Sequence, residues 1–356
     1  KWSWRFIMSE FKVNTITNRD GSYGPQVCGI TTFGSSGMQL PSGPTEFRGG
    51  RGRAVFAGGS QQPSGSQWQS VMDKVEIATT GNATDFGDMD QGRYYNRAVS
   101  NSTRGVIAGG TGDGTGSPAM TSNMQFVTIS SEGGSNDFGD MDFARNGLVP
   151  ASNNIRGLLA AGYVSPANIR DTQILFITIS TTGNSNGFGS LSEAQDQGAG
   201  INSPTRGVFA GCKNPARSDV ISFVTISTLG DGQDFGNLTT SKGAMPGASS
   251  STRGLIFGGD DGSNFINNID LITIPTQGNA TDFGDLLAIN AESTAASSQL
   301  RGLCAGGETP TGGGWTNVIQ YVTIATAGNA IDFGDLTVAR GNDLGGFSDA
   351  HGGLAQ

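Results

Sequence analysis

The sequence predicts an all-β protein, a six-bladed β-propeller with four antiparallel strands in each blade. The main observation is an Asp-Phe-Gly phrase, or a close variant of it, that recurs six times along the chain. Its phenylalanines are Phe86, Phe138, Phe188, Phe235, Phe283 and Phe333. They lie 47 to 52 residues apart, a period too long for a leucine-rich or ankyrin repeat and suited to one four-stranded blade. Glycine provides 58 of the 356 residues and charged residues only 14%, against an average of about 25%, as expected for a chain rich in turns.

An arginine marks the second strand of each unit, 29 to 34 residues before the phenylalanine. These arginines are Arg53, Arg104, Arg156, Arg206, Arg253 and Arg301. A short apolar run follows each of them and usually ends in a glycine pair such as Gly58-Gly59, whereas Ala161-Gly162 and Gly211-Cys212 keep one glycine of the pair. Because small apolar residues suit the crowded centre of such a fold, we expect these runs to lie near its axis.

The unit around Phe138 illustrates the other strands. Arg97–Ser102, rich in small residues, is the predicted first strand, and Gly105–Gly109 is the second. Gln125–Ser130 is rich in β-branched and aromatic residues and is the predicted third strand. A turn follows that contains glycine and asparagine in most units, as in Gly81-Asn82, because these residues tolerate positive φ. The Asp-Phe-Gly phrase then begins the outer, fourth strand.

The two ends of the chain differ from the repeats. No segment before the first unit resembles a first strand, so this unit lacks one. At the other end, Arg340–Gly353 follows the last Asp-Phe-Gly phrase and aligns with Arg145–Gly157, which places His351 at the position of Arg156. We therefore expect the C-terminal tail to pair with Ala54–Ala57, closing the ring and removing a free sheet edge.

The predicted domains are an N-terminal extension and arm, residues 1–48, and the propeller, residues 49–356. The arm is rich in Gly, Ser and Pro and differs from the repeats. It is a candidate element for attachment or oligomerisation. Met8 reads as a natural start, which leaves open whether residues 1–7 belong to the mature protein.

Acidic residues recur beside the phenylalanines and allow two interpretations. Those directly before it are Asp85, Asp137, Asp234, Asp282 and Asp332. A ring of calcium sites is one interpretation, because hard cations bind several oxygens. The acids lack the alternate spacing of calcium loops, so we favour bonds to backbone N–H groups or ion pairs with the repeated arginines. Asn186–Ser190 contains no acid, and we expect one arginine near it to lack its usual partner. No metal or cofactor is predicted.

Charge and residue inventory argue against several functions. The net charge is −9 and no basic stripe is present, which argues against nucleic-acid binding. No segment reaches the roughly 18 consecutive apolar residues of a membrane span. Cys28, Cys212 and Cys304 lack disulfide or zinc spacing, and one histidine, His351, cannot form a multi-histidine metal site. Because no Gly-x-Ser-x-Gly elbow and no P-loop occur, we expect a protein without enzymatic activity.

The repeat resembles that of kelch β-propellers, with phenylalanine where kelch units usually carry tryptophan. Phrases such as Thr103-Arg104-Gly105-Val106 and Gly278–Leu286, together with the opening Lys12–Thr17, are similar to glycine-rich repeat proteins of marine cyanophage virions. This resemblance covers nearly the whole chain from Met8 onward. It implies a virion structural or tail-fibre protein, exposed on the particle and in contact with the host envelope.

The loops after the glycine pairs vary most between units and are expected to share one rim. They carry four aromatic candidates for ligand binding, Trp68, Tyr163, Phe265 and Trp315, beside short polar residues. Aromatic faces with polar neighbours suit sugar rings, which stack on an apolar plane and form hydrogen bonds through their hydroxyls. The alternative is that these side chains only pin their own loops to the blades.

Three functions remain open at this point. The first is a virion surface protein whose rim binds a host glycan or envelope protein. The second is a structural decoration or fibre joint that contacts other virion proteins through the arm, with a homo-oligomer as one option. A polysaccharide-cleaving enzyme is a distant third.

Overall fold

The computed structural model describes residues 52–61, 67–112, 119–310 and 314–354. The chain divides into the units Lys1–Glu46 and Phe47–Gln356, and all described residues belong to the second. The extension and arm predicted for residues 1–48 therefore lie outside the described residues.

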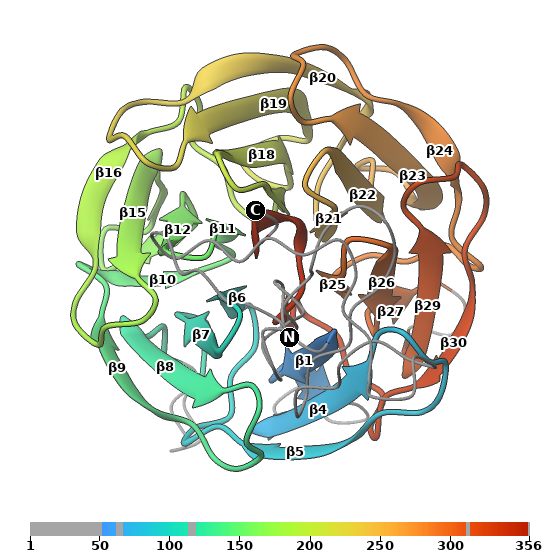
Figure 1. Ribbon diagram of the computed structural model, residues 1–356. Coiled ribbons are helices and arrows are strands. Elements are labelled where there is room, and N and C mark those ends of the chain that lie inside the picture. The colour runs from blue at the N-terminus through green and yellow to red at the C-terminus, as the bar shows by residue number, and fades with distance from the viewer. Residues whose placement is uncertain (1–51, 62–66, 113–118, 311–313, 355–356) are drawn as a thin grey trace, which may run out of the picture. The chain divides into compact units, whose positions relative to one another are not determined.

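Antiparallel strands build the described part of the chain, and six sheets of four strands contain most of them (Figure 1). Sheet one is β31 (Gly345–Ser348), β1 (Arg53–Ala57), β4 (Val71–Glu76) and β5 (Thr84–Asp88). Sheet two is β6 (Arg97–Ser100), β7 (Arg104–Ala108), β8 (Asn123–Thr128) and β9 (Asn136–Asp140). Sheet three is β11 (Val149–Ser152), β12 (Arg156–Ala160), β15 (Gln173–Thr178) and β16 (Asn186–Ser190).

The other three sheets repeat this order. Sheet four is β17 (Ala199–Asn202), β18 (Arg206–Cys212), β19 (Ser218–Thr225) and β20 (Gln233–Lys242). Sheet five is β21 (Gly247–Ser249), β22 (Arg253–Asp260), β23 (Phe265–Thr273) and β24 (Thr281–Asp285). Sheet six is β25 (Thr294–Ser297), β26 (Arg301–Ala305), β29 (Val318–Thr323) and β30 (Ile331–Asp335).

Several short strands lie in the connections between the longer strands. They are β2 (Ser60–Gln61), β3 (Gln67–Trp68), β10 (Ala144–Asn146), β13 (Tyr163–Ser165), β14 (Ile169–Arg170), β27 (Glu308–Thr309) and β28 (Gly314–Trp315). A 3₁₀ turn, η2 (Gly352–Leu354), ends the described chain. Across these residues we find no helix that is long and apolar enough to cross a membrane.

The predicted pairing of the C-terminal tail is confirmed. β31 runs antiparallel to β1, with Ser348 opposite Ala54 and Gly345 opposite Ala57. The prediction that His351 takes the position of Arg156, at the start of a second strand, is wrong. The tail supplies only a first strand, while β1 supplies the second strand and keeps Arg53 in the arginine position. His351 follows β31 instead and is buried.

The first strands form a closed cycle. Figure 1 shows the sheets succeeding one another around a common centre, with β6, β11, β21 and β25 on the inside and β5, β9, β16, β20, β24 and β30 on the outside. Each first strand contacts the first strand of the next sheet, in the order β31, β6, β11, β17, β21, β25 and back to β31.

Hydrogen bonds near the centre complete the same cycle through one polar residue at the end of each first strand. These residues are Ser100, Ser152, Asn202, Ser249, Ser297 and Ser348. In this order, the backbone N–H of each residue from Ser100 to Ser249 donates to the side chain of the next residue. The last two bonds come from side chains: Ser348 Oγ donates to the Ser297 carbonyl, and Ser100 Oγ donates to the Ser348 carbonyl. Sheet six is thereby joined to sheet two through the C-terminal tail.

The Asp-Phe-Gly phrase joins each sheet to the next at the outer edge. Its phenylalanine side chains are only 2 to 4% exposed. The carbonyl of each phenylalanine accepts the N–H of the turn glycine of the following sheet, and Phe333 accepts that of Gly81 in sheet one. The glycine of the phrase is required by this contact: Gly284 has φ +146°, and a Cβ there would lie 2.5 Å from the carbonyl oxygen of Gly328. The turn that the sequence predicted thus also binds the neighbouring sheet.

The repeated arginines do not pair with the aspartates before the phenylalanines, so that expectation is wrong. Each arginine donates from Nη1 to a backbone carbonyl of the next sheet: Arg53 to Ile129, Arg104 to Ile179, Arg156 to Ile226, Arg206 to Ile274, Arg253 to Ile324 and Arg301 to Ile77. The strand register explains the error. Arg53 lies opposite Glu76 of β4, with which it forms an ion pair. Asp85 lies opposite Asp73, further along the sheet, on β5, which is separated from β1 by β4.

Sheet three also contradicts the prediction of an arginine without its usual partner. Arg156 keeps the Ile226 carbonyl, and its guanidinium lies over the Phe176 ring at 5.0 Å. Because the acceptor is a backbone carbonyl, the loss of the acids in this repeat has no effect on the arginine.

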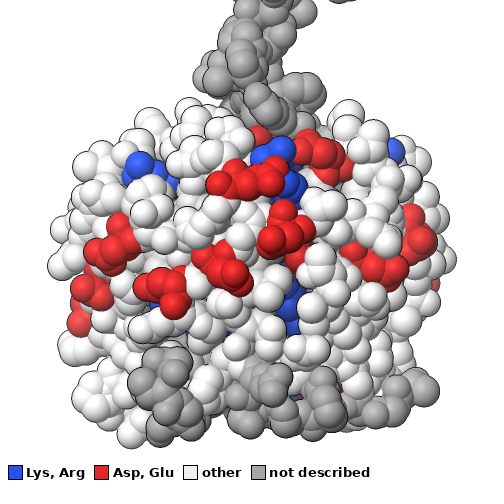
Figure 2. Space-filling model, turned by 90° about the horizontal axis from the view of Figure 1, so that it is seen from below, with Lys and Arg blue, Asp and Glu red and all other residues white. Residues whose placement is uncertain are grey.

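The recurrent aspartates are mostly exposed, and their bonds are local. Asp85 Oδ1 accepts the N–H of Gly87 at 3.0 Å, and Asp137 Oδ1 accepts the Asn123 side-chain amide at 3.0 Å. Figure 2 shows many acidic and few basic side chains on the face that it presents. In the part of the chain that the structure covers, no three His, Cys, Asp or Glu side chains are grouped so that they could hold a metal ion.

A buried polar residue seven positions after each phenylalanine was missed by the sequence analysis. These residues are Arg93, Arg145, Gln195, Lys242, Asn290 and Arg340. Arg340, fully buried, donates to the carbonyls of Gly58, Val71 and Phe56 and forms an ion pair with the fully buried Asp73 at 2.7 Å. The constant seven-residue spacing between the phenylalanine and this polar residue could have been recognised in the sequence. Nothing in a single repeat indicates that the side chain is buried.

Candidate binding site between sheets three and four

A pocket of about 230 Å³ lies among the connections of sheets three and four. Its lining residues are Tyr95, Asn146, Tyr163, Arg170, Asp196, Gln197, Lys213 and Asn214. Of the four aromatic residues predicted for ligand binding, it includes only Tyr163. The pocket combines two aromatic rings with amides and both signs of charge.

A small three-stranded sheet builds one wall of the pocket. In the order β10, β13, β14, it places Tyr163 directly opposite Asn146 on one side and Arg170 on the other. The guanidinium of Arg170 lies 4.6 Å from the centre of the Tyr163 ring, a cation–π contact that fixes both side chains. The Tyr163 hydroxyl also bonds to Asn168, at 3.3 Å.

Asp196 anchors the opposite wall. It forms an isolated bridge with Asn214, and its side chain accepts the Asn214 backbone N–H and side-chain amide, each at 3.1 Å. Arg170 Nε donates to the same carboxylate at 3.1 Å, which links the two walls. Burial raises the pKa of Asp196, and the bonds from Arg170 and Asn214 oppose this rise. The carboxylate is therefore occupied by protein donors.

Lys213 connects the pocket to a buried charge network. It forms an ion pair with Glu292, beside which Asp343 pairs with Arg97 at 2.9 Å. Burial acts to lower the pKa of Lys213, but the charge of Glu292, its hydrogen bond and the charge of Asp343 together outweigh burial, so the pKa is raised and the amine stays protonated. Burial, and then the charge of Asp343, raise the pKa of Glu292. Gln197 ties the pocket to this network by donating to Asp343 at 2.7 Å.

Trp68 and Trp315 lie outside the pocket lining. The Trp68 and Tyr94 rings are nearly parallel, with centres 6.4 Å apart, and Tyr94 contacts Tyr95 of the pocket at 4.8 Å. Trp315 packs on Gly341, where a Cβ would overlap the indole. Trp68 and Trp315 thus contact neighbouring residues, and their role in ligand binding stays a prediction.

Phe265 lies outside the pocket around Tyr163. It begins β23 opposite Asp260 and lines a depression of about 420 Å³ with Ile289 and Pro310. Two of the four predicted aromatic residues, Tyr163 and Phe265, therefore line different cavities.

The polar residues of the pocket were missed by the sequence analysis because they belong to loops without a repeated pattern. One signal was present. The pocket is flanked by the two units with a degenerate glycine pair, since Tyr163 follows Ala161-Gly162 and Lys213 follows Gly211-Cys212. Ala161 keeps the left-handed backbone of its glycine counterparts, with φ +60°.

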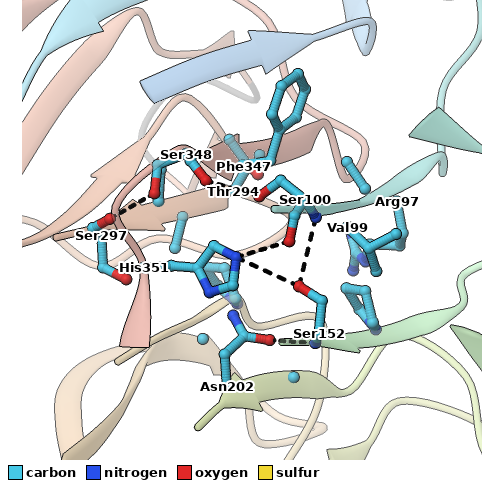
Figure 3. Close-up of a pocket in the computed structure, with 18 of the residues that line it drawn as sticks. Arg97, Val99, Ser100, Ser152, Asn202, Thr294, Ser297, Phe347, Ser348 and His351 are labelled. Atoms are coloured by element: carbon cyan, nitrogen blue, oxygen red, sulfur yellow. Dashed lines mark hydrogen bonds between the residues drawn. The ribbon is translucent and has the colours of Figure 1, made fainter. Parts of the chain in front are cut away.

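A second cavity, of about 50 Å³, lies at the centre and is lined by the first strands (Figure 3). His351 projects into it from the C-terminal tail, beside Ser100 and Ser152. The His351 Nε2 donates to the Ser100 carbonyl at 2.9 Å, and Nδ1 accepts the N–H of Gly353 at 3.1 Å. Ser152 Oγ is 3.4 Å from Nε2, but this nitrogen carries the proton and cannot act as a base toward the hydroxyl. The cavity has room for a few water molecules only.

The chain matches no protein-family model and no curated protein sequence.

Proposed function

We propose that the unit Phe47–Gln356 is a six-bladed β-propeller of the kelch-like kind. Six four-stranded antiparallel sheets, the closed cycle of first strands and the C-terminal strand in sheet one support this proposal. We further propose that it acts as a binding protein without enzymatic activity. Both ring nitrogens of His351 form hydrogen bonds with the backbone, and this supports the proposal that the protein is not an enzyme.

The proposed ligand is a glycan, and the pocket around Tyr163 is the observation that carries this proposal. Tyr163 supplies an aromatic plane, and amides surround it: the Nδ2 of Asn146 donates to Thr111, and the Nε2 of Gln197 donates to Asp343. Both amides keep a side-chain oxygen that can accept from a sugar hydroxyl. An apolar plane beside a few fixed polar groups is the arrangement that sugar binding requires.

The proposed setting is the surface of a virion, where the protein would recognise a glycan of the host envelope. The resemblance of the repeat phrases to cyanophage virion proteins supports this setting. Residues 1–48 would then attach the unit to other virion proteins. The structural alternative, a decoration or fibre joint, requires no pocket and predicts that no glycan binds.

The test is binding of the purified protein to an array that includes cyanobacterial envelope polysaccharides. We expect the wild type to bind and Tyr163→Ala to lose most of the binding. Phe265→Ala is the matched control, because it removes an aromatic side chain outside the pocket, and it should bind like the wild type. Absence of binding by the wild type would contradict the glycan proposal and favour the structural alternative.

A further inference from the structure

The charged groups of the pocket differ in how much of their hydrogen-bonding capacity the protein itself already uses. Both oxygens of Asp196 already accept hydrogen bonds, from Arg170 Nε and from the backbone and side chain of Asn214. By contrast, the Nη1 and Nη2 atoms of Arg170 have no hydrogen-bond partner among the described residues. Lys213 Nζ uses one of its three protons on Glu292. The charged groups with unused hydrogen-bonding capacity are therefore cations.

From this we infer that the pocket binds an acidic sugar, with the carboxylate of a uronic acid on Arg170. The inference rests on the proposed glycan function and narrows it to one class of sugar. A guanidinium presents its donors as a rigid fork that matches a planar carboxylate. In Arg170, Asp196 holds Nε and Tyr163 holds the guanidinium plane, so the fork is oriented before the ligand arrives.

The same geometry separates recognition of the ring from recognition of the acid. The sugar ring stacks on Tyr163 or on the neighbouring Tyr95, and its hydroxyls reach the amides of Asn146 and Gln197. The carboxylate reaches the Nη atoms of Arg170. A neutral sugar keeps the stacking and the amide contacts and lacks the charged hydrogen bonds.

The test compares methyl glucuronide with methyl glucoside, which differ only in the carboxylate at C6, by titration at pH 7 followed by NMR. We expect the wild type to bind the glucuronide more tightly. Arg170→Gln should weaken glucuronide binding by about ten- to hundredfold, as expected for losing a charged hydrogen bond. It should weaken glucoside binding less, because the neutral sugar loses only the support that Arg170 gives to the Tyr163 ring. Arg170→Lys keeps the charge without the fork and should give an intermediate loss.

Lys74→Gln is the matched control, because Lys74 forms an ion pair with Glu132 and neither residue lines the pocket. It should bind both sugars like the wild type, and thermal melts should show that all variants remain folded. Equal binding of the two sugars, unchanged in Arg170→Gln and lost in Tyr163→Ala, would overturn the acidic-sugar inference and leave the glycan function intact. If neither sugar binds the wild type and the polysaccharide array is also blank, both proposals fail.

Discussion

The buried His351 should make the stability of the fold depend on pH. Burial lowers the pKa of His351 from 6.5 to about 4, with the hydrogen bond to Ser100 opposing this shift. The geometry agrees, because Nε2 donates to the Ser100 carbonyl and Nδ1 accepts from Gly353. A second proton on Nδ1 would replace an attractive hydrogen bond by two facing donors. Among the described residues that line this cavity, Arg97 carries the charge, and it pairs with Asp343.

The size of the effect follows from the two pKa values. The unfolded chain binds the proton first as the pH falls below 6.5, because the folded pKa is lower. The contribution of His351 to stability is therefore fully present above pH 6.5 and is lost as the pH falls toward 4. A difference of about 2.5 pKa units corresponds to about 3 kcal/mol over this interval.

The assay is urea unfolding of the wild type and His351→Gln at pH 7, 6, 5 and 4. Gln keeps a side-chain donor and does not titrate, so the variant measures the pH dependence of all other groups. The wild type should lose about 3 kcal/mol more than the variant between pH 7 and pH 4. The protection of the Gly353 amide against hydrogen exchange, measured relative to the intrinsic rate at each pH, should fall over the same interval, because this N–H is bonded to Nδ1. Parallel pH profiles for the two proteins would refute the reasoning.

Two further predictions concern stability, and both are measured by urea unfolding. Gly284→Ala should destabilise the fold by about 1–3 kcal/mol, because the residue has φ +146° and faces the Gly328 carbonyl. Gly187→Ala is the control, because the space around its Cβ position is open. This variant should change the stability by less than about 0.5 kcal/mol. An equal loss in both variants would contradict the role of the inter-sheet contact. Asp73→Asn should cost about 3–5 kcal/mol by leaving the buried charge of Arg340 uncompensated. A variant as stable as the wild type would show that the pair contributes nothing.

Most strand positions could be predicted from the sequence because each depends on local residues. The predicted first strand Arg97–Ser102 contains β6, and the predicted third strand Gln125–Ser130 overlaps β8, which begins two residues earlier. The closing pair of β31 and β1 was predictable because a missing strand at one end matched a surplus strand at the other.

The partners of the repeated side chains could not be predicted in the same way. The sequence placed each arginine and each aspartate at the same end of a unit, and their opposite charges suggested ion pairs. The register instead displaces Asp85 along the sheet from Arg53, and the arginine reaches the next sheet. A repeat pattern reports that a residue recurs and carries no information on which neighbour it contacts.

The candidate site was predicted only in part. Aromatic residues in variable loops were recognisable, and Tyr163 does line the pocket. Arg170, Asp196 and Lys213 were not recognised, because they belong to different loops and meet only when two neighbouring sheets bring those loops together.

The sequence by itself thus determined the all-β class, the six repeats, the order of strands and the pairing of the C-terminal tail. These features follow from local strand and turn preferences and from one period. Only the tertiary structure decided the bonds between sheets, the neutral buried His351 and the composition of the pocket. The physical reason is that each of these depends on the packing of one sheet against the next, which sets distances between residues that are far apart in the chain.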